Sequence, residues 1–534
     1  MSNALDRAAR QVEKRSGLVR RSGTSFAGAA NNRLLADWSK WVMSPTLELK
    51  YELTQLRARS RDLCKNNPHG RRFLAAVAEN VIGHKGIRLQ ARNLLPDGER
   101  DRPNNARIEQ GWRDFGRYGV CTVDRHHTWI GAQQLGAKLM AMDGEVFWRD
   151  VAGYDNAHGF AIQFIDPDLI DETFSVPSRG PANEIVMGVE IDEWGAEVAY
   201  WMWTQYSSDN TGRLRERIRV PATEMHHLFV QRRPNQYRGD PWLAPVMVPM
   251  QHTGGYVEAE IVAARASAAK MGFIIPGEDN GEDESEQPDE EKFFEAAAGI
   301  VERLKHGDTF AEWDPQHPTG AFESFIAAMA RMTAAGLNMG PTTLTGDYTR
   351  TNYSSHRGEK LVERDGWRVL QGFFAEGFNE AVFLKWLPIA RLAGALDLPG
   401  KTQQWLAHDW RPRGWPWVDP LRDLEANGTA LAMQLTSRTR LCAEEGEDFE
   451  EILAELAEEK DLAASYGVEL SDPATTFIGV PDNDDDEEGD PDEAGDPIPA
   501  DDAGKGRPRK ALGGRRARAH LHLQRGALPA VVRQ

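Results

Sequence analysis

The chain has 534 residues, of which 40% are hydrophobic and 27% charged, and it carries a formal net charge of −19. This length predicts several domains, and the hydrophobic content is enough to form buried cores. The acidic charge excludes a protein that wraps nucleic acid by neutralising many phosphates. The sequence also shows neither a long apolar run nor a charged-then-apolar leader, so we expect no membrane span and no secretion signal.

The charges are distributed unevenly along the chain. Residues 1–40 carry eight Lys/Arg against three acids, whereas residues 278–291 hold nine carboxylates and no base. Residues 482–502 hold twelve carboxylates, and nine Lys/Arg follow between Lys505 and the end. We predict a basic, mobile arm over 1–45, an acidic surface loop at 278–291 and a disordered tail over 471–534.

The first half of the sequence predicts helices followed by strands. Residues 46–82 are helical, with Asn66-Asn67-Pro68 ending one helix and starting another. Alternating runs predict strands at 87–90, 145–149, 160–165 and 197–203, with turns at Asp97-Gly98, Asp143-Gly144 and Trp194-Gly195. One helix, around 104–118, is expected among these strands.

The second half is mainly helical. Helices are predicted over about 244–271 and 322–338, the latter with an apolar face formed by Phe322, Phe325, Ile326 and Met329. Gly340-Pro341 ends this helix, and another of about 33 residues, roughly 50 Å long, is expected from 354 to 386. Four glycines within it, at 358, 366, 372 and 377, predict a bend. A further helical region is expected around 420–468.

A polar, hydroxyl-rich loop lies between these two helices, within residues 344–360. Asn352, Ser354 and Ser355 offer side-chain oxygens to begin the second helix. The loop lacks the spacing of catalytic residues, because Ser354-Ser355-His356 are sequence neighbours and no GxSxG motif accompanies them. A polar loop between two helices suits a transient contact with a polymer.

Four carboxylates could be drawn together as the ligands of a metal-dependent nuclease: Asp143, Glu145, Asp166 and Asp168. The preferred interpretation is a hairpin turn at Asp143-Gly144 and a loop entry at Asp166-Pro167-Asp168. The pairs His126-His127 and His226-His227 are interpreted as structural, because neighbouring side chains diverge and no metal-ligand spacing is present. With no nucleotide-binding motif either, we expect no enzyme, no metal and no cofactor.

Cysteine and tryptophan residues carry weaker signals. Cys64, Cys121 and Cys442 are widely spaced and predict reduced thiols that are not paired in disulfides. Trp410, Trp415 and Trp417 alternate with Pro and Arg. Packing across a subunit or domain boundary is the preferred role for them, with a stacking platform as the alternative.

Several ordered segments together resemble the portal proteins of tailed bacteriophages, in the lambda-type branch. They cover about residues 30–465 and comprise residues 60–68 with 80–83, 143–145, 164–168, 238–245, 258–265 and 345–357. The longest is Thr345-Gly-Asp-Tyr-Thr-Arg-Thr-Asn-Tyr-Ser-Ser-His-Arg357. The sequence departs from the family pattern at His356, where a small residue is expected, and in the acidic insert and the basic C-terminal end.

The resemblance implies an α+β portal fold. Its parts would be a wing (46–245), a first stem helix (246–272), a clip (273–319) and a second stem helix (320–339). A tunnel loop (340–353), a long kinked helix (354–396) and a helical crown (397–470) would follow.

The resemblance also implies a function. The chain would be one subunit of a ring, usually a dodecamer, at one capsid vertex of the virion, assembled in the host cytoplasm. Double-stranded DNA would pass through the ring transiently and without sequence specificity. The implied protein partners are the terminase large subunit, the major capsid and scaffold proteins, and head-completion or adaptor proteins.

A sliding DNA duplex requires few strong phosphate contacts, because each neutralised phosphate adds affinity. The predicted channel residues of the tunnel loop are therefore mostly uncharged: Thr342, Thr343, Thr345, Asp347, Tyr348, Thr349, Arg350 and Asn352. Two other classes stay open at this point. One is a DNA-processing enzyme built on the four carboxylates, and the other is an interaction scaffold that binds through its charged tails.

Overall fold

The computed structural model describes residues 42–179, 182–209, 214–268, 272–275, 309–312, 320–349, 351–416 and 419–468. The contacts divide the chain into two units, residues 1–457 and 458–534. The second unit contributes only the end of the last helix to the described part. Arg350, Trp417, the acidic stretch 278–291, most of the arm and the tail lie outside the described residues.

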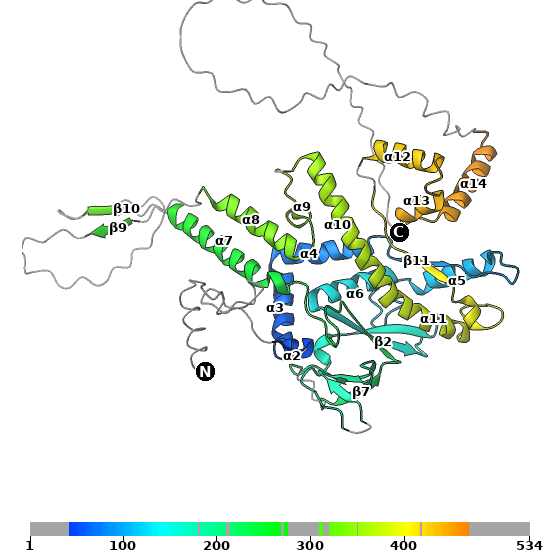
Figure 1. The fold of residues 1–534 in the computed structure, drawn as a ribbon, viewed down its shortest axis with the longest axis horizontal. Helices are drawn as coiled ribbons and strands as arrows, with labels where there is room; N and C mark the ends of the chain where they lie inside the picture. Colours follow the sequence, from blue (N-terminus) through cyan, green and yellow to red (C-terminus); the bar gives the residue numbers. More distant parts are fainter. Residues whose placement is uncertain are drawn as a thin grey trace, which may run out of the picture. The chain divides into compact units, whose positions relative to one another are not determined.

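Mixed helices and strands build the first unit (Figure 1). The helices are α2 (Pro45–Lys50), α3 (Leu53–Asn66), α4 (Pro68–Val77), α5 (Arg102–Phe115), α6 (Trp129–Asp143), α7 (Met247–Ala268), α8 (Phe322–Gly336), α9 (Pro341–Thr345), α10 (Tyr353–Phe374), α11 (Glu380–Leu392), α12 (Pro420–Ala432) and α13 (Arg438–Glu444). α14 (Phe449–Ser465) crosses into the second unit. This mixture confirms the α+β class.

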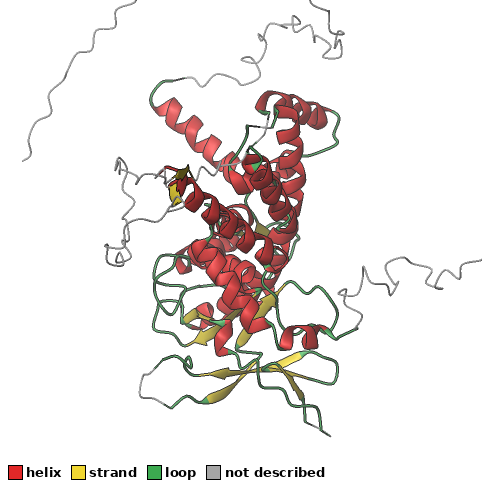
Figure 2. Cartoon of the chain, turned by 90° about the vertical axis from the view of Figure 1, so that its left-hand side faces the viewer, coloured by secondary structure: helices red, strands yellow, loops and turns green. Residues whose placement is uncertain are grey.

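Within the described residues, the strands form four antiparallel sheets, and Figure 2 shows them below and among the helices. They are β1 (Arg88–Ala91), β2 (Glu145–Ala152), β3 (Phe160–Ile165), β4 (Glu184–Val186), β5 (Val189–Ile191), β6 (Glu197–Trp203), β7 (Arg217–Pro221), β8 (Met225–Phe229), β9 (Gly272–Ile275), β10 (Thr309–Glu312) and β11 (His408–Arg411). Their order is β3-β2-β8 and β4-β5-β6-β7, with β1-β11 and β10-β9 as separate pairs.

Two apolar cores hold the first unit together. The larger core joins α4, α5 and α6 to α10 and α11, so residues as distant in sequence as Leu63 and Trp405 belong to it. The smaller core lies between β2 and the four-stranded sheet and contains Phe147, Tyr200 and Met225. Strand β2 therefore faces both cores, and charged side chains at its start lie where the two meet.

Several local predictions are confirmed. Asn67 caps α4, because its side chain accepts hydrogen bonds from the backbone N–H groups of His69 and Gly70, and Pro68 occupies the first turn. Cys64 and Cys121 are buried and free, and Cys442 is half-buried and free. Asn352 caps α10 by accepting a 2.8 Å hydrogen bond from the backbone N–H of Ser355.

The predicted hairpin turn at Asp143-Gly144 was wrong. Gly144 instead ends helix α6 in the left-handed conformation, with φ +88°, and leads directly into β2. Helix α6 itself was not predicted. Its residues are apolar on most sides because it is covered by other elements, so it lacks the one-sided pattern by which a surface helix is detected.

The long helix after the polar loop is interrupted, but at one place only. α10 passes into a π-helical turn, Ala375–Asn379, and α11 continues to Leu392. Gly358, Gly366 and Gly372 lie in regular helix with open space beside them, so they do not cause the interruption. Gly377 lies in the π turn, where a Cβ would come within 2.4 Å of Leu228.

Candidate functional site

The polar loop begins in a short helix that is firmly held. Gly340 and Pro341 start α9, and Gly346, at φ +71°, ends it. The hydroxyl of Thr342 donates to Glu359 at 2.6 Å, and that of Thr343 donates to Glu363 at 2.6 Å. Glu359 and Glu363 are one turn apart on α10, so two hydroxyl–carboxylate contacts fix α9 against that helix.

Two neighbouring cations strengthen this attachment. The ammonium of Lys360 contacts the hydroxyl of Thr343 and forms a 3.2 Å ion pair with Glu363. From α4, the Arg72 guanidinium donates to the backbone carbonyl of Thr343 at 3.0 Å. Thr342 and Thr343 are 4% and 7% exposed. Their prediction as channel hydroxyls is therefore corrected, because their hydroxyls bind α10 inside the subunit.

The tip of the loop, by contrast, is open to solvent. Thr345, Asp347, Tyr348, Thr349 and Asn352 are all exposed. The carboxylate of Asp347 accepts hydrogen bonds from the backbone N–H and the hydroxyl of Thr349, at 2.9 and 2.7 Å. These contacts shape a local turn, so the tip has a defined form on a fixed base.

His356, on α10, contacts the tip. Its ring meets the ring of Tyr348 edge-on, with 5.2 Å between centroids. Tyr348 is 54% exposed, so one face is supported by α10 and the rest of the ring is open. His356 thus supports an aromatic side chain of the loop from α10.

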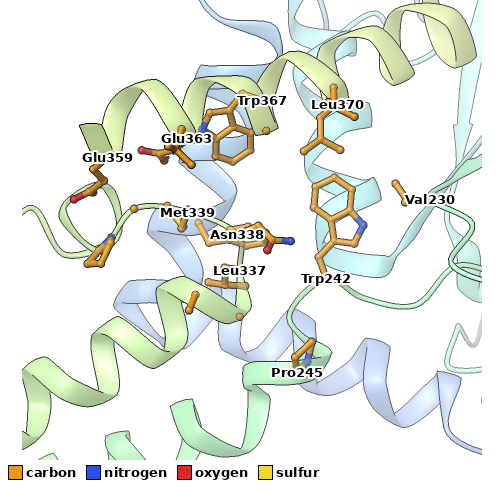
Figure 3. Close-up of a pocket in the computed structure, with 18 of the residues that line it drawn as sticks. Val230, Trp242, Pro245, Leu337, Asn338, Met339, Glu359, Glu363, Trp367 and Leu370 are labelled. Atoms are coloured by element: carbon orange, nitrogen blue, oxygen red, sulfur yellow. Dashed lines mark hydrogen bonds between the residues drawn. The ribbon is translucent and has the colours of Figure 1, made fainter. Parts of the chain in front are cut away.

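A large apolar groove lies behind the base of the loop (Figure 3). It has a volume of about 1020 Å³ and lies between the α8–α9 connection, α10 and the segment before α7. The labelled side chains of Leu337, Met339, Trp367, Leu370 and Trp242 point into it. The groove shares Glu359 and Glu363 with the attachment of the loop.

The four carboxylates proposed for metal binding are instead bound by arginines. On α3, Arg57 pairs with Asp168 at 2.6 Å, and Arg61 pairs with Asp143 at 2.7 Å and Asp166 at 2.9 Å. Glu145 is fully buried and faces Arg238. Across the described ranges, His, Cys, Asp and Glu side chains do not gather in any group of three or more suited to a metal ion.

Glu145 and His227 lie at the centre of this network. Burial alone would raise the pKa of Glu145, but the charge of Arg238 and the hydrogen bond from His227 hold that pKa far below its ordinary value. Burial alone would lower the pKa of His227, but Glu197 and Glu145 raise it. The two ring nitrogens of His227 lie 3.0 Å from Glu145 and 3.2 Å from Glu197, an arrangement that favours the imidazolium.

His226 and His227 make different contacts within the fold. Their side chains diverge from strand β8: His226 meets Asp150 at 2.7 Å and stacks on Trp148, whereas His227 stacks on Phe147 in the smaller core. The arginines that complete the network could not be recognised from the sequence, because Arg57 and Arg61 appear there as ordinary charges on a polar helix.

Two of the three clustered tryptophans pack within the first unit. Trp410 donates to Glu380 at 3.0 Å, and Trp415 donates to Asn80 at 3.0 Å. The guanidinium groups of Arg364, Arg368 and Arg413 surround the Trp415 ring, at 5.9, 5.7 and 5.4 Å from its centroid. These contacts join distant segments of one chain, whereas the predicted packing across a subunit or domain boundary stays a prediction.

Comparison with known proteins identifies the family. The model of the lambda family of phage portal proteins matches residues 31–371, and the chain belongs to that family. A probable portal protein of Halomonas phage phiHAP-1 is 31% identical, over 81% of this chain and 86% of its own length. Portal protein B of Escherichia phage lambda is 24% identical, over 82% of this chain and 88% of its own.

Structural comparison gives weaker likenesses to two particle necks. One is the neck of a native GTA particle computed with C12 symmetry, with a TM-score of 0.37, 13% identity and coverage of 76% of this chain and 95% of that one. The other is the neck of an empty GTA particle computed with C6 symmetry, with a TM-score of 0.37, 15% identity and coverage of 74% and 93%.

Family membership defines the class of function. The chain is a phage portal protein, a structural component of the virion at the portal vertex, and it is not an enzyme. The nuclease alternative has no support in the family or in the arginine-bound carboxylates. In the part of the chain that is described, no helix has both the length and the apolar character to cross a membrane.

Proposed function

We propose that this chain forms a ring, with twelve subunits as the preferred number, through which double-stranded DNA enters and leaves the capsid, and that the loop tip contacts the passing duplex. The observation that carries the proposal is the exposed, mostly uncharged tip mounted on a base fixed by Thr342 and Thr343. Hydroxyl and amide groups make short-lived phosphate contacts that carry no sequence information.

The described helices and strands can be matched to the parts of the portal fold as follows. α7 and α8 lie side by side in Figure 1 and would be the stem, with the β9–β10 pair at the far end within the clip. The strand-rich region would be the wing, α10 and α11 the kinked helix, and α12 to α14 the crown. The clip would meet the terminase large subunit and then the adaptor proteins, and the outer surface would meet capsid and scaffold proteins.

Replacing the tip tests the proposal. Residues 345 and 347–351 are exchanged for Gly and Ser, while Gly346 and the cap residue Asn352 are retained. We expect intact rings by negative-stain electron microscopy, but fewer DNA-filled heads or faster loss of packaged DNA. The same exchange at the turn 96–99, with Gly98 kept, is the control and should package normally. Normal yields of filled, stable heads from the loop variant would contradict the proposal.

A further inference from the structure

The groove behind the loop has the size and chemistry of a docking site for a polypeptide segment. Its volume of about 1020 Å³ lies just above the range of about 300–1,000 Å³ for small-molecule pockets. Besides its aromatic and aliphatic walls, Val362 and Val369 stand at its edge on α10 and are 76% and 73% exposed. Exposed apolar patches of this kind mark interaction surfaces.

The first described residues of the chain contact Arg233, the residue that follows the groove residue Arg232 in sequence. Arg233 donates to the backbone carbonyl of Met43 at 3.0 Å and pairs with Glu48 at 2.7 Å, which fixes the entry point. Arg232, the preceding residue, lines the groove, as does Val230. Val42, next to the entry point, is 99% exposed. The residues before position 42 therefore enter beside Arg233, whose neighbour in sequence, Arg232, lines the groove.

The sequence just before this point suits an apolar groove. Leu34, Trp38 and Trp41 are spaced at i, i+4 and i+7, the spacing of one helical face. Leu35 and Val42 directly follow Leu34 and Trp41 in sequence, and they would widen that apolar face on one side. The family model begins its match at residue 31, so it includes this segment and leaves out the more basic residues before it.

We infer that residues 33–42 dock through Leu34, Trp38 and Trp41 into the groove between the α8–α9 connection and α10 of the same chain. A helix of this length spans about 15 Å, and bound aromatic side chains would cover Val362 and Val369. Docking would brace the base of the tunnel loop, because Glu359 and Glu363 belong both to the groove and to the loop attachment. The inference does not depend on DNA passage.

Chemical cross-linking of the full chain tests the docking directly. Asp37→Cys, beside the docking side chains but not one of them, is combined with Val369→Cys at the groove edge. Cys442→Ser removes the half-buried native thiol, and a short bis-maleimide is added. We expect a link within one chain, located by peptide mass spectrometry. Arg368→Cys in place of Val369→Cys is the matched control, since Arg368 is exposed on α10 but does not line the groove. Links only between chains, or equal linking in the control, would overturn the inference.

Blocking the groove provides a second test. Gly366 lines the groove with open space beside it, so Gly366→Met fills the groove without a clash in α10. Gly372→Met is the control, because Gly372 has equal space on α10 and lies outside the groove. We expect tryptic cleavage after Lys40 to be slow in the wild type and the control, and roughly tenfold faster in Gly366→Met, the change produced by losing about 1.4 kcal/mol of docking. Equal cleavage rates in three folded proteins would reject the docking.

Discussion

The guanidinium of Arg238 and the carboxylate of Glu145 face one another in complete burial, with 2.5 Å from Nη2 to Oε1 and 2.9 Å from Nε to Oε2. Glu145 begins β2, and Arg238 lies in the segment that leads to helix α7. The backbone N–H of Gly239 adds a 2.9 Å hydrogen bond to the same carboxylate. This pair ties the strand-rich region to the start of α7.

Removing one partner of this pair should strongly destabilise the fold. Arg238→Met leaves Glu145 buried with less compensation, and we expect the free energy of unfolding to fall by about 3–5 kcal/mol. The exposed pair Arg117–Asp114 is the control, and Arg117→Met should cost about 1 kcal/mol or less. Urea denaturation followed by circular dichroism measures both. Similar losses of unfolding free energy in the two variants would show that the buried pair contributes no more to stability than the exposed pair.

The raised pKa of His227 predicts a pH dependence of stability. A group whose folded pKa lies above its unfolded value of about 6.5 contributes stability that is fully present below that pH and is lost as the pH rises through the folded pKa. His227 faces Glu145 and Glu197, with Arg238 beyond. We therefore expect the wild type to lose stability as the pH rises above about 6.5, and His227→Gln to lose less over the same range.

Urea midpoints measured from pH 6 to pH 9 test this expectation. His126→Gln, at an exposed histidine, is measured as a control for the loss of one imidazole. Parallel profiles for all three proteins would mean that His227 binds the same number of protons in the folded and unfolded states throughout this pH range.

Two glycines of the long helix should respond in opposite directions to alanine. Gly366 has open space and regular helical surroundings, so Gly366→Ala should stabilise the protein by up to about 1 kcal/mol. In the π turn, a Cβ at Gly377 would lie 2.4 Å from Leu228, which is buried, so Gly377→Ala should destabilise by about 1–3 kcal/mol. Differential scanning calorimetry measures whether each variant is more or less stable than the wild type. If Gly377→Ala were stabilising, the Leu228 side chain would move away from the new Cβ without any loss of stability.

The threonines of the loop should separate into two classes. Thr343→Val removes a hydrogen bond to the buried Glu363 and should cost about 1–3 kcal/mol of stability. Thr349→Val changes an exposed hydroxyl and should alter stability by about 0.5 kcal/mol or less. Thermal unfolding measures the difference. If both variants changed stability equally and only slightly, the hydrogen bond from Thr343 to Glu363 would not hold the loop base. Thr343 would then again be a candidate for contact with DNA.

The sequence by itself determined the elements that depend on local chemistry. Asn67-Pro68 starts α4 and Asn352 starts α10 because each side chain caps its own backbone. The ordered portal motifs gave the family, and the uncharged character of the loop tip was visible in Thr345, Tyr348 and Thr349.

The tertiary structure alone decided which polar groups face inward. Thr342 and Thr349 are alike in sequence, yet one is held by Glu359 and the other is exposed, because only the packing of α9 on α10 brings a carboxylate to the first. The four carboxylates were visible as a group, but Arg57, Arg61 and Arg238 reach them from distant segments. Helix α6 and the π turn were hidden for a related reason: both are shaped by surrounding elements, and a covered helix has no polar face to reveal it.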